Sequence, residues 1–342
     1  MRLKLHGLDE EAPVPAACVV PGKIGVVTVL FNSAGMLPDF FVSIESQTYK
    51  NFVVYCVDNA SADGSARICA GRGSLYEVIP NQKNVGVAAG NNQGIRAAIT
   101  SGCEYVLFLN NDVSFPADLF EQLVEGIHRH HADMTTPMIY FADPPNLIWC
   151  AGGGFFTLGG YRPIHYGEFT RDTKRFAADS RIDYAPTCCV LAKTASIHTI
   201  GLMDERYFVY WDDVDWMLRA KRAGASLWYL GGARLWHKVS SLTGGREAEF
   251  SVRYTRRNKA YFLYKNVNRP GTLALRIGYS TYYLLLALLP RRRKKAWLCF
   301  RSWQEGAALY KSATKAQNRS VMQASQQSRT GSPSATYPKA RP

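Results

Sequence analysis

The sequence predicts an α/β fold with a mainly parallel central sheet. Short apolar, β-branched runs alternate with helix-like segments through the first 130 residues, which is typical of βαβ units. Polar clusters follow three of these runs, at Asn32, Asp58 and Asn110–Asp112. Ligands gather at the carboxyl ends of strands in such sheets, so these clusters are expected to lie together.

The first half of the domain contains four expected strands, each a short apolar run. They cover residues 25–31, 52–57, 76–79 and 105–109. Helices are expected at residues 36–48, where apolar side chains have helical spacing, after the Asp63-Gly64-Ser65 cap, and at residues 92–100.

The second half of the domain contains both strand-like and helix-like sequence patterns. The glycine-rich segment 152–160 predicts a loop or a hairpin. Strands are expected at residues 185–193 and 227–230, the latter ending before Gly231-Gly232. Helices are expected at residues 195–200, 214–223 and 256–264.

Composition sets the broad class. With 47% hydrophobic and 20% charged residues, the chain is that of a globular protein, which excludes chain-wide disorder and a polytopic membrane protein. We expect a loose leader at residues 1–22, without the features of a signal peptide. The leader is expected to be followed by a globular domain at 23–265, a basic amphipathic helical extension at 266–315 and a disordered tail at 316–342. The eight cysteines form no CxxC pair, so reduced thiols are expected.

The positive charge is concentrated in one segment. Residues 253–342 hold 19 Lys and Arg and one acid, Glu305, whereas residues 1–252 carry a net charge of −4. Residues 277–289 are uncharged and apolar, and a basic run at 291–295 follows. A stretch of this length is shorter than a membrane span, and the pattern indicates an element on an anionic membrane surface. The alternative is a packed C-terminal helix with a solvated charge run.

Two strand-end carboxylates suggest ligand chemistry. Asp112 is suited to a hard cation such as Mg²⁺ or Mn²⁺, which would also hold diphosphate oxygens. Asp58 is suited to accept a hydrogen bond from a nucleobase. For each of them, an ordinary turn is the structural alternative. The segment 84–94 is rich in small residues before a helix, which favours close approach to an anion, but it is neither a GxGxxG fingerprint nor a Walker A loop.

An acidic cluster marks the second half of the domain. Asp212, Asp213 and Asp215 lie at an expected helix start, next to Trp211. Close carboxylates raise one another's pKa, which suits a general base, and the aromatic neighbour suits a sugar. An acidic helix cap with core tryptophans is the alternative. His237 follows an apolar strand as a candidate metal or phosphate contact, or as a structural histidine.

Taken together, these motifs resemble glycosyltransferase family 2, the inverting enzymes with the A-type fold. The resemblance is strongest to the bacterial rhamnosyltransferase-like and galactofuranosyltransferase-like members. The matching stretches run in family order: residues 27–32, 57–65, 84–94, 107–113, 201–224, 236–244 and Arg257-Asn258-Lys259.

The resemblance implies a role for each motif. Residues 23–113 would form the nucleotide-binding half and residues 114–265 the acceptor-binding half. Asp213 would be the catalytic base, supported by Asp212, while Asp112 and His237 would bind the cation. Trp211 and Asp215 would contact the acceptor. The nucleotide sugar would be bound by Asn32, Asp58, Asn84, Gly86, Asn91, Asn110 and Asn111.

Three positions depart from the family pattern. Asn110 replaces an Asp of the metal motif, Asn91 stands where many relatives carry a basic residue, and Asp212 replaces a frequent Glu. The first of these leaves open a nucleotide-sugar-binding protein without turnover.

The resemblance also implies the substrates and the place of action. The donor would be dTDP-rhamnose, with a UDP-sugar as the alternative. The acceptor would be a hydroxyl of a glycan or lipid-linked molecule in cell-surface polysaccharide synthesis. The enzyme would work in the cytoplasm, peripherally on the inner face of the membrane. The basic C-terminal segment alone would also suit nucleic acid, but that interpretation ignores the acidic clusters, and no nucleic-acid partner is expected.

Overall fold

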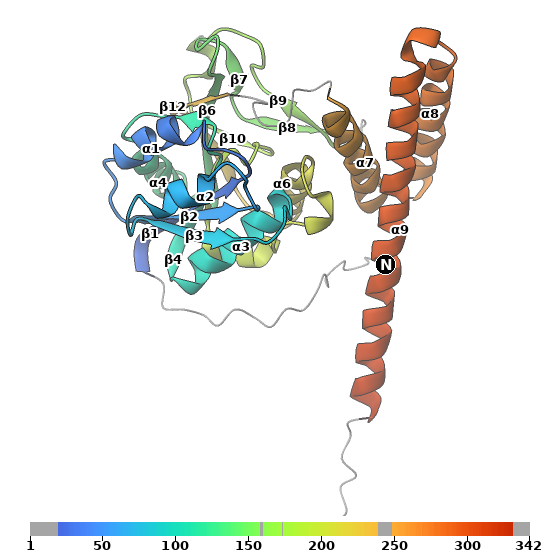
Figure 1. Ribbon diagram of the computed structural model, residues 1–342, viewed down its shortest axis with the longest axis horizontal. Helices are drawn as coiled ribbons and strands as arrows, with labels where there is room; N and C mark the ends of the chain where they lie inside the picture. Colours follow the sequence, from blue (N-terminus) through green and yellow to red (C-terminus); the bar gives the residue numbers. More distant parts are fainter. Residues whose placement is uncertain (1–19, 158–159, 173, 239–247, 268, 331–342) are drawn as a thin grey trace, which may run out of the picture.

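The computed structural model describes residues 20–157, 160–172, 174–238, 248–267 and 269–330. In these residues a ten-stranded sheet forms the centre of the molecule, in the order β10-β12-β6-β11-β4-β1-β2-β3, with β5 and β7 added at β12 and β6 (Figure 1). The mixed α/β architecture with helices on both faces of this sheet confirms the predicted fold class.

The first half supplies four neighbouring parallel strands. Its strands are β1 (Val20–Leu30), β2 (Phe52–Asp58), β3 (Tyr76–Pro80) and β4 (Cys103–Leu109), and all of the pairings among them are parallel. The helices between them are α1 (Leu37–Glu45), α2 (Ser65–Ala70) and α3 (Val87–Thr100).

Alternation along the strands divides the core into two layers. Val27 of β1 and Phe108 of β4 pack in the layer that contains α3, whereas their neighbours Val26 and Leu107 pack in the layer that contains α1. Successive side chains of a strand point to opposite faces, so continuous apolar runs are buried on both sides. This explains why the central strands contain almost no polar residues.

The second half adds antiparallel and long-range pairings. After β5 (Val113–Ser114) and α4 (Leu119–Arg129), the chain forms β6 (Met134–Phe141), β7 (Ile148–Cys150), the hairpin of β8 (Gly153–Phe156) and β9 (Arg162–His165), and β10 (Ser180–Ile182). It continues with β11 (Cys189–Lys193), α5 (Thr194–Ile200), α6 (Asp212–Arg222) and β12 (Leu227–His237). Short 3-10 turns lie at Lys174–Phe176 and Glu205–Tyr207.

The predicted end of the last strand at Gly231-Gly232 was wrong. β12 continues to His237, and its register with β6 shifts between Leu230 and Arg234. The glycines therefore form a bulge, which a pattern that treats glycine as a strand end does not detect. The continuation is important because it carries His237 to the carboxyl end of the sheet, where it pairs with Val113.

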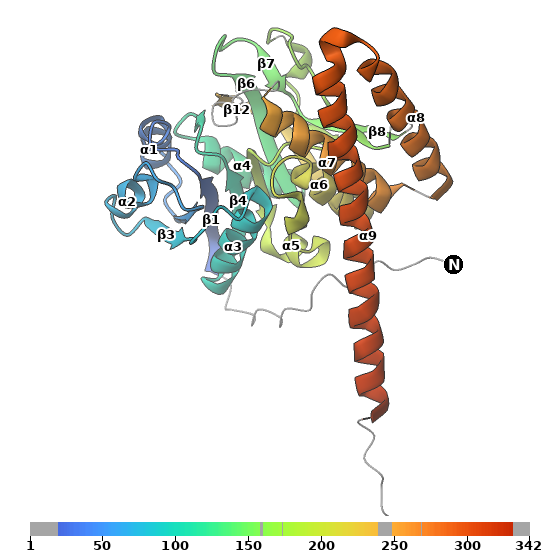
Figure 2. The same ribbon diagram turned by 45° about the vertical axis from the view of Figure 1, so that its right-hand side comes forward.

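Three helices follow the sheet domain: α7 (Glu249–Asn266), α8 (Arg269–Ala287) and α9 (Arg293–Thr330), with a 3-10 turn at Pro290–Arg292. Figures 1 and 2 show α8 and α9 as an antiparallel pair whose bend lies beyond the sheet domain. Among the described residues no single helix is long and apolar enough to cross a membrane, although the bent pair Leu273–Ala287 and Pro290–Ala316 meets that test by length and composition.

The two predicted end segments differ from the structure. β1 begins at Val20, whose amide bonds to the Gly102 carbonyl, so the predicted leader is partly strand, and residues 1–19 lie outside the described residues. α9 continues to Thr330, so residues 316–330 are helical where disorder was predicted, and residues 331–342 are not described. A composition poor in apolar residues does not prevent a helix, because Ala, Gln and Lys have high helix propensity. The seven cysteines in the described part are buried free thiols, as expected; Cys18 lies outside it.

Candidate active site

The three predicted polar clusters follow neighbouring parallel strands. Leu30, at the end of β1, pairs with Asp58 at the end of β2, and Val27 pairs with Phe108 near the end of β4. The residues after these strands therefore lie at one edge of the sheet. This is the convergence that the alternation of strands and helices predicted.

Asp58 is suited to hold a donor group at this edge. Its carboxylate is buried, and Oδ2 accepts a hydrogen bond from the Ser61 amide at 3.1 Å. Within the described part of the chain, Oδ1 has no hydrogen-bond partner. A buried oxygen without a partner is costly, so it is suited to accept a hydrogen bond from a ligand. Asn32 fixes the same loop, because its Oδ1 accepts from the Ala62 amide at 2.9 Å.

The start of α3 borders the same edge of the sheet. The Asn84 carboxamide accepts from the Gly86 amide at 2.9 Å, which fixes the turn before the helix. Gly86 has φ +90°, and a β-carbon there would lie 2.5 Å from the Phe208 carbonyl oxygen, so only glycine fits. Asn91 is buried and directs its amide nitrogen to the Met203 sulfur at 3.6 Å, so its contact with the donor remains a prediction.

Asp112 and His237 form a pair from elements far apart in the sequence. Asp112 Oδ1 lies 3.1 Å from His237 Nε2, and Asn110 Nδ2 lies 3.4 Å from the same nitrogen. The Asn111 amide donates to the Val29 carbonyl at 2.8 Å and fixes β4 to β1, and its contact with the nucleotide sugar remains a prediction. Asp112 and His237, which the resemblance assigns to the cation, therefore lie together, and their binding of it remains a prediction.

This pair is suited to a divalent cation. Mg²⁺ and similar cations are commonly held by one or two protein ligands together with substrate phosphates. A carboxylate oxygen and an imidazole nitrogen 3.1 Å apart can supply two such ligands. Among the described residues no group of three or more His, Cys, Asp or Glu side chains is placed to hold a metal, so the remaining ligands would come from the substrate and water.

The acidic cluster begins α6 and contains two kinds of carboxyl group. Asp212 is buried, and burial together with the charge of Asp213 raises its pKa to about 8. Burial also raises the pKa of Asp213, but hydrogen bonds from the Tyr184 hydroxyl at 2.8 Å and the Val214 amide at 2.7 Å oppose the rise. At neutral pH, Asp213 is therefore the ionised member of this pair and Asp212 is the protonated one.

Asp215 is a structural residue, which corrects its predicted contact with the acceptor. It is fully buried and pairs with Lys265 at 2.9 Å and Arg219 at 3.1 Å. Burial alone would raise its pKa, but these two cations hold the pKa well below the usual range. Since it lies on the opposite side of α6 from Asp213, it anchors the helix against α7.

Both carboxylate sites lie close to one cysteine. Burial raises the pKa of the Cys188 thiol well above its ordinary value, and the charges of Asp112 and Asp213 add to this effect. Cys188 lies just before β11, and its carbonyl accepts from the Asn110 amide at 3.0 Å. Both carboxylates therefore lie within electrostatic range of the same thiol.

The segment before α6 has a strained backbone that α7 holds in place. Phe208, Tyr210 and Trp211 have φ of +66°, +65° and +68°, in the left-handed region that non-glycine residues rarely adopt. Asn258 is fully buried, and its amide nitrogen donates to the carbonyls of Tyr207, Val209 and Tyr210 at 2.7, 2.7 and 2.9 Å. The Trp211 ring packs on Phe262 with ring centroids 5.1 Å apart.

A row of rings that the sequence did not indicate connects the Asp112–His237 pair with Asp213. Trp149 lies edge-on to both His237 and His165, with ring centroids 4.8 and 5.0 Å apart. His165 stacks on Tyr184, whose hydroxyl donates to Asp213. These residues come from β7, β9 and the segment after β10. No periodic pattern marks them, because their only common feature is their position in space.

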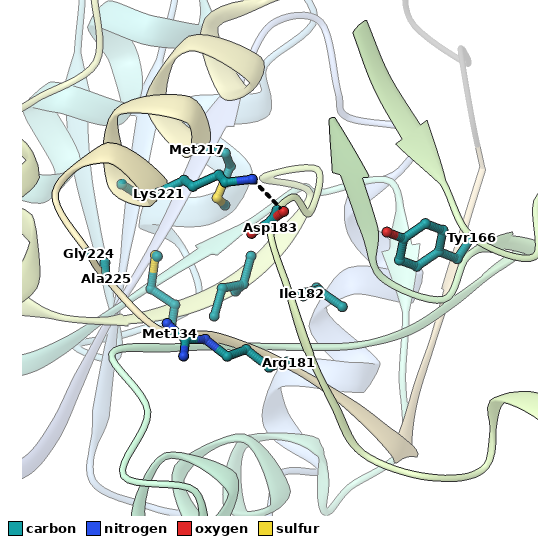
Figure 3. A pocket seen from close by; sticks show the side chains of 11 residues that line it. Met134, Tyr166, Arg181, Ile182, Asp183, Met217, Lys221, Gly224 and Ala225 are labelled. Carbon is teal, nitrogen blue, oxygen red and sulfur yellow. Dashed lines mark hydrogen bonds and ion pairs between the residues drawn. The ribbon is translucent and has the colours of Figure 1, made fainter. Parts of the chain in front are cut away.

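Two pockets lie near this half of the domain. One of about 620 Å³ adjoins the row of rings and is lined by His165, Tyr166, Glu168, Arg171, Arg175 and Phe176 among others. The other, of about 390 Å³, is shown in Figure 3 with Lys221 paired to Asp183 at 2.6 Å. It includes Met134 and Leu227, the first residues of β6 and β12, so it lies at the edge of the sheet opposite to Asp58 and Asp112.

Comparisons with known proteins agree with this geometry. The chain is 26% identical over 238 residues to an N-acetylglucosaminyl-diphospho-decaprenol L-rhamnosyltransferase of Mycobacterium tuberculosis, covering 64% of this chain and 77% of that protein. It is 23% identical over 263 residues to the galactofuranosyltransferase GlfT1 of Mycolicibacterium smegmatis, covering 72% and 83%.

A solved structure supports the fold. The crystal structure of GalNAc-T7 with UDP, GalNAc and Mn²⁺ superposes with a TM-score of 0.53 at 16% identity, over 70% of this chain. The match spans about half of that structure, 49% of its length. The model of the family described as glycosyl transferase family 2 matches residues 25–196, which is about half of the 342 residues. With the A-type fold, the strand-end site and this match in agreement, the chain belongs to glycosyl transferase family 2, as the motifs predicted.

Proposed function

We propose that this glycosyltransferase transfers a sugar, with inversion, from a nucleotide diphosphate to an acceptor hydroxyl, with Asp213 as the base. The observation that carries this proposal is the unequal pair at the start of α6. Asp212 is buried with a pKa raised to about 8, and Asp213 is partly exposed and held by Tyr184. Two adjacent carboxyl groups with different surroundings supply one protonated group and one base.

The mechanism follows from the positions of these residues. Asp58 and the start of α3 hold the nucleotide and orient it. A divalent cation held by Asp112 and His237 would neutralise charge on the departing diphosphate. Asp213 removes the proton from the acceptor hydroxyl as that oxygen attacks the anomeric carbon from the face opposite the diphosphate. The row Trp149, His165 and Tyr184 orients the base and borders the acceptor.

The substrates are proposed from the relatives. dTDP-rhamnose is the proposed donor and a UDP-sugar the alternative, because a rhamnosyltransferase is among the similar proteins. A glycan or lipid-linked acceptor in cell-surface polysaccharide synthesis is proposed on the same basis. A lipid-linked acceptor requires the enzyme to work at a membrane, so we place it peripherally on the cytoplasmic face.

The test is the substitution Asp213→Asn, which keeps the shape of the side chain and removes the base. Transfer from the nucleotide sugar is expected to fall by about 10³-fold, while nucleotide affinity changes little. Sugar transfer is followed by chromatography, and nucleotide binding by calorimetry. Asp118→Asn, the same change at an exposed helix start, is the matched control and keeps full activity.

Two outcomes would contradict the proposal. A fully active D213N variant would remove Asp213 from the chemistry. A wild-type protein that binds nucleotide sugars with Mn²⁺ but neither transfers nor hydrolyses them would instead support the binding protein without turnover that Asn110 suggested.

A further inference from the structure

Helix α8 has one face packed in the protein. Leu275, Tyr279, Tyr283 and Leu286 belong to the hydrophobic core or pack against it, and their spacing of four, four and three residues places them on one side of the helix. The Tyr279 ring lies 4.5 Å from that of Trp303 on α9. This face therefore requires no further partner.

The other face of α8 is apolar and exposed. Ile277 and Leu285 are 58% and 59% exposed, and Leu273 and Leu284 are similarly accessible. Directly after the helix, Leu288 is 76% exposed, and Leu289 is also accessible. A contiguous exposed apolar surface of this kind is uncommon on soluble monomers and marks an interaction site. Since residues 277–289 contain no charged side chain, water is a poor solvent for this face.

The bend after α8 carries a dense positive charge. Arg291, Arg292, Arg293 and Lys294 are exposed directly beside Leu288. No Asp or Glu occurs between Glu249 and Glu305 to balance them. The exposed apolar helix face and the cations thus form one surface, which we call the α8 surface.

We propose that the α8 surface docks on a bilayer with anionic lipid headgroups, with α8 lying along the membrane. Apolar side chains on one face of a helix enter the boundary of the acyl chains, and adjacent cations bind the headgroups. Crossing of the membrane by the bent pair would bury these cations in hydrocarbon, which is strongly unfavourable. Nucleic acid would leave the leucines exposed to water, and a second copy would bring the same positive charge to the interface.

The position of α8 connects this docking to the acceptor, a point that rests on the proposed function. The turn between β8 and β9 contacts α7 and α8: a β-carbon on Gly160 would lie 2.3 Å from Leu263 and 3.6 Å from Leu275. The same hairpin continues to His165 beside the base. The membrane-facing helix and the acceptor side of the site are therefore packed together, as a lipid-linked acceptor requires.

The test is sedimentation of the full chain with vesicles. Wild-type protein is expected to bind vesicles of phosphatidylglycerol and phosphatidylcholine and to bind pure phosphatidylcholine far more weakly. The triple variant Arg291→Ser, Arg292→Ser, Arg293→Ser should bind the anionic vesicles about 100-fold more weakly at low salt. The double variant Leu284→Ser, Leu288→Ser should lose binding at high salt as well. Salt screens the attraction between the cations and the headgroups, so mainly the apolar contacts hold the protein on the vesicle under those conditions.

The matched control removes the same charge elsewhere on α9. Lys311, Lys315 and Arg319 are exposed and lie at least about 27 Å along the helix from Arg293. Their replacement by Ser should reduce binding little. All variants should keep transfer to a soluble acceptor analogue, which separates failure of docking from failure of the proposed function.

Three results would overturn the docking proposal. In the first, the Arg291–Arg293 variant binds vesicles as the wild type does. In the second, the control variant loses as much binding. In the third, the leucine variant converts a dimer to a monomer in light scattering while vesicle binding is unchanged, so that a second copy occupies the α8 surface.

Discussion

Asp212 and Asp213 are adjacent in the sequence, but their surroundings differ. The Asp212 carboxyl is enclosed, so its pKa rises to about 8, while Asp213 accepts hydrogen bonds that stabilise its charged form. Because α6 begins at Asp212, the two side chains point in different directions around the helix. Local geometry thus distinguishes the two residues.

The hydroxyl of Tyr184 should set the pH dependence of the reaction. Its hydrogen bond lowers the pKa of Asp213 against the effect of burial, so Tyr184→Phe should raise that pKa. A base must be deprotonated, so the acid limb of the kcat/KM profile should move to higher pH, by about one unit for a hydrogen bond to a charged group. Initial rates between pH 5 and 9 provide the measurement.

A matched control removes a hydroxyl that also bonds to a carboxylate but lies far from the site. The Tyr76 hydroxyl bonds to Glu45 Oε1 at 3.2 Å, so Tyr76→Phe should leave the profile unchanged. An acid limb that does not move in Y184F, in an otherwise folded protein, would exclude Tyr184 as a positioning residue for the base.

At the scale of elements, the segment from Arg206 to Trp211 joins the start of α3 to the acidic cluster at the start of α6. The Val87 amide, at the start of α3, donates to the Phe208 carbonyl at 2.5 Å. From the other side, Arg257 donates to the carbonyls of Arg206 and Tyr207 at 2.7 and 2.8 Å. Helices α3 and α7 therefore hold the same strained segment directly before Asp212.

Loss of the Asn258 amide should misplace the base without removing it. Asn258→Ala removes the side-chain donor to the Val209 and Tyr210 carbonyls and one of the donors to the Tyr207 carbonyl, which allows the left-handed residues to relax. We expect kcat to fall about 100-fold, because small displacements of a reacting group are costly, with a much smaller change in donor KM. Steady-state kinetics at saturating donor measure the two effects separately.

The control for this prediction lies on the same helix. Arg253 of α7 pairs with Glu305 at the surface, and Arg253→Ala should keep kcat. Equal losses of kcat in both variants would indicate general damage to α7 and would contradict a specific role for Asn258.

At the scale of the whole molecule, donor and cation should stabilise the fold together. Asp58 ends β2 and Asp112 follows β4, whereas His237 ends β12, so a ligand at this edge connects both halves of the sheet. At 100 times its dissociation constant a ligand adds about 2.7 kcal/mol to the free energy of unfolding. The melting temperature should rise by several degrees with dTDP-rhamnose and Mn²⁺ together, more than with either alone.

The part of this rise that depends on the cation should disappear in His237→Ala. His198, exposed on α5, provides the control, and His198→Ala should retain the full response. Thermal unfolding with and without a chelator measures the difference. If H237A keeps the Mn²⁺ response of the wild type, the cation binds elsewhere.

The sequence by itself determined the fold class, the family, the strand-end positions of Asp58 and Asp112, and the position of the acidic cluster at a helix start. These follow from local patterns: apolar runs specify strands, polar residues end them, and parallel strands share a carboxyl edge. The same patterns identified the uncharged stretch 277–289 and the basic run after it.

The tertiary structure alone decided which polar residues are structural and which face the site. Asp215 and Asp213 are two residues apart, yet Lys265 and Arg219 neutralise the first and Tyr184 orients the second. Trp149, His165 and Tyr184 come together only through long-range strand pairing, which no local pattern encodes. Burial and charge at a residue depend on neighbours distant in the chain, so its pKa and its role are properties of the fold.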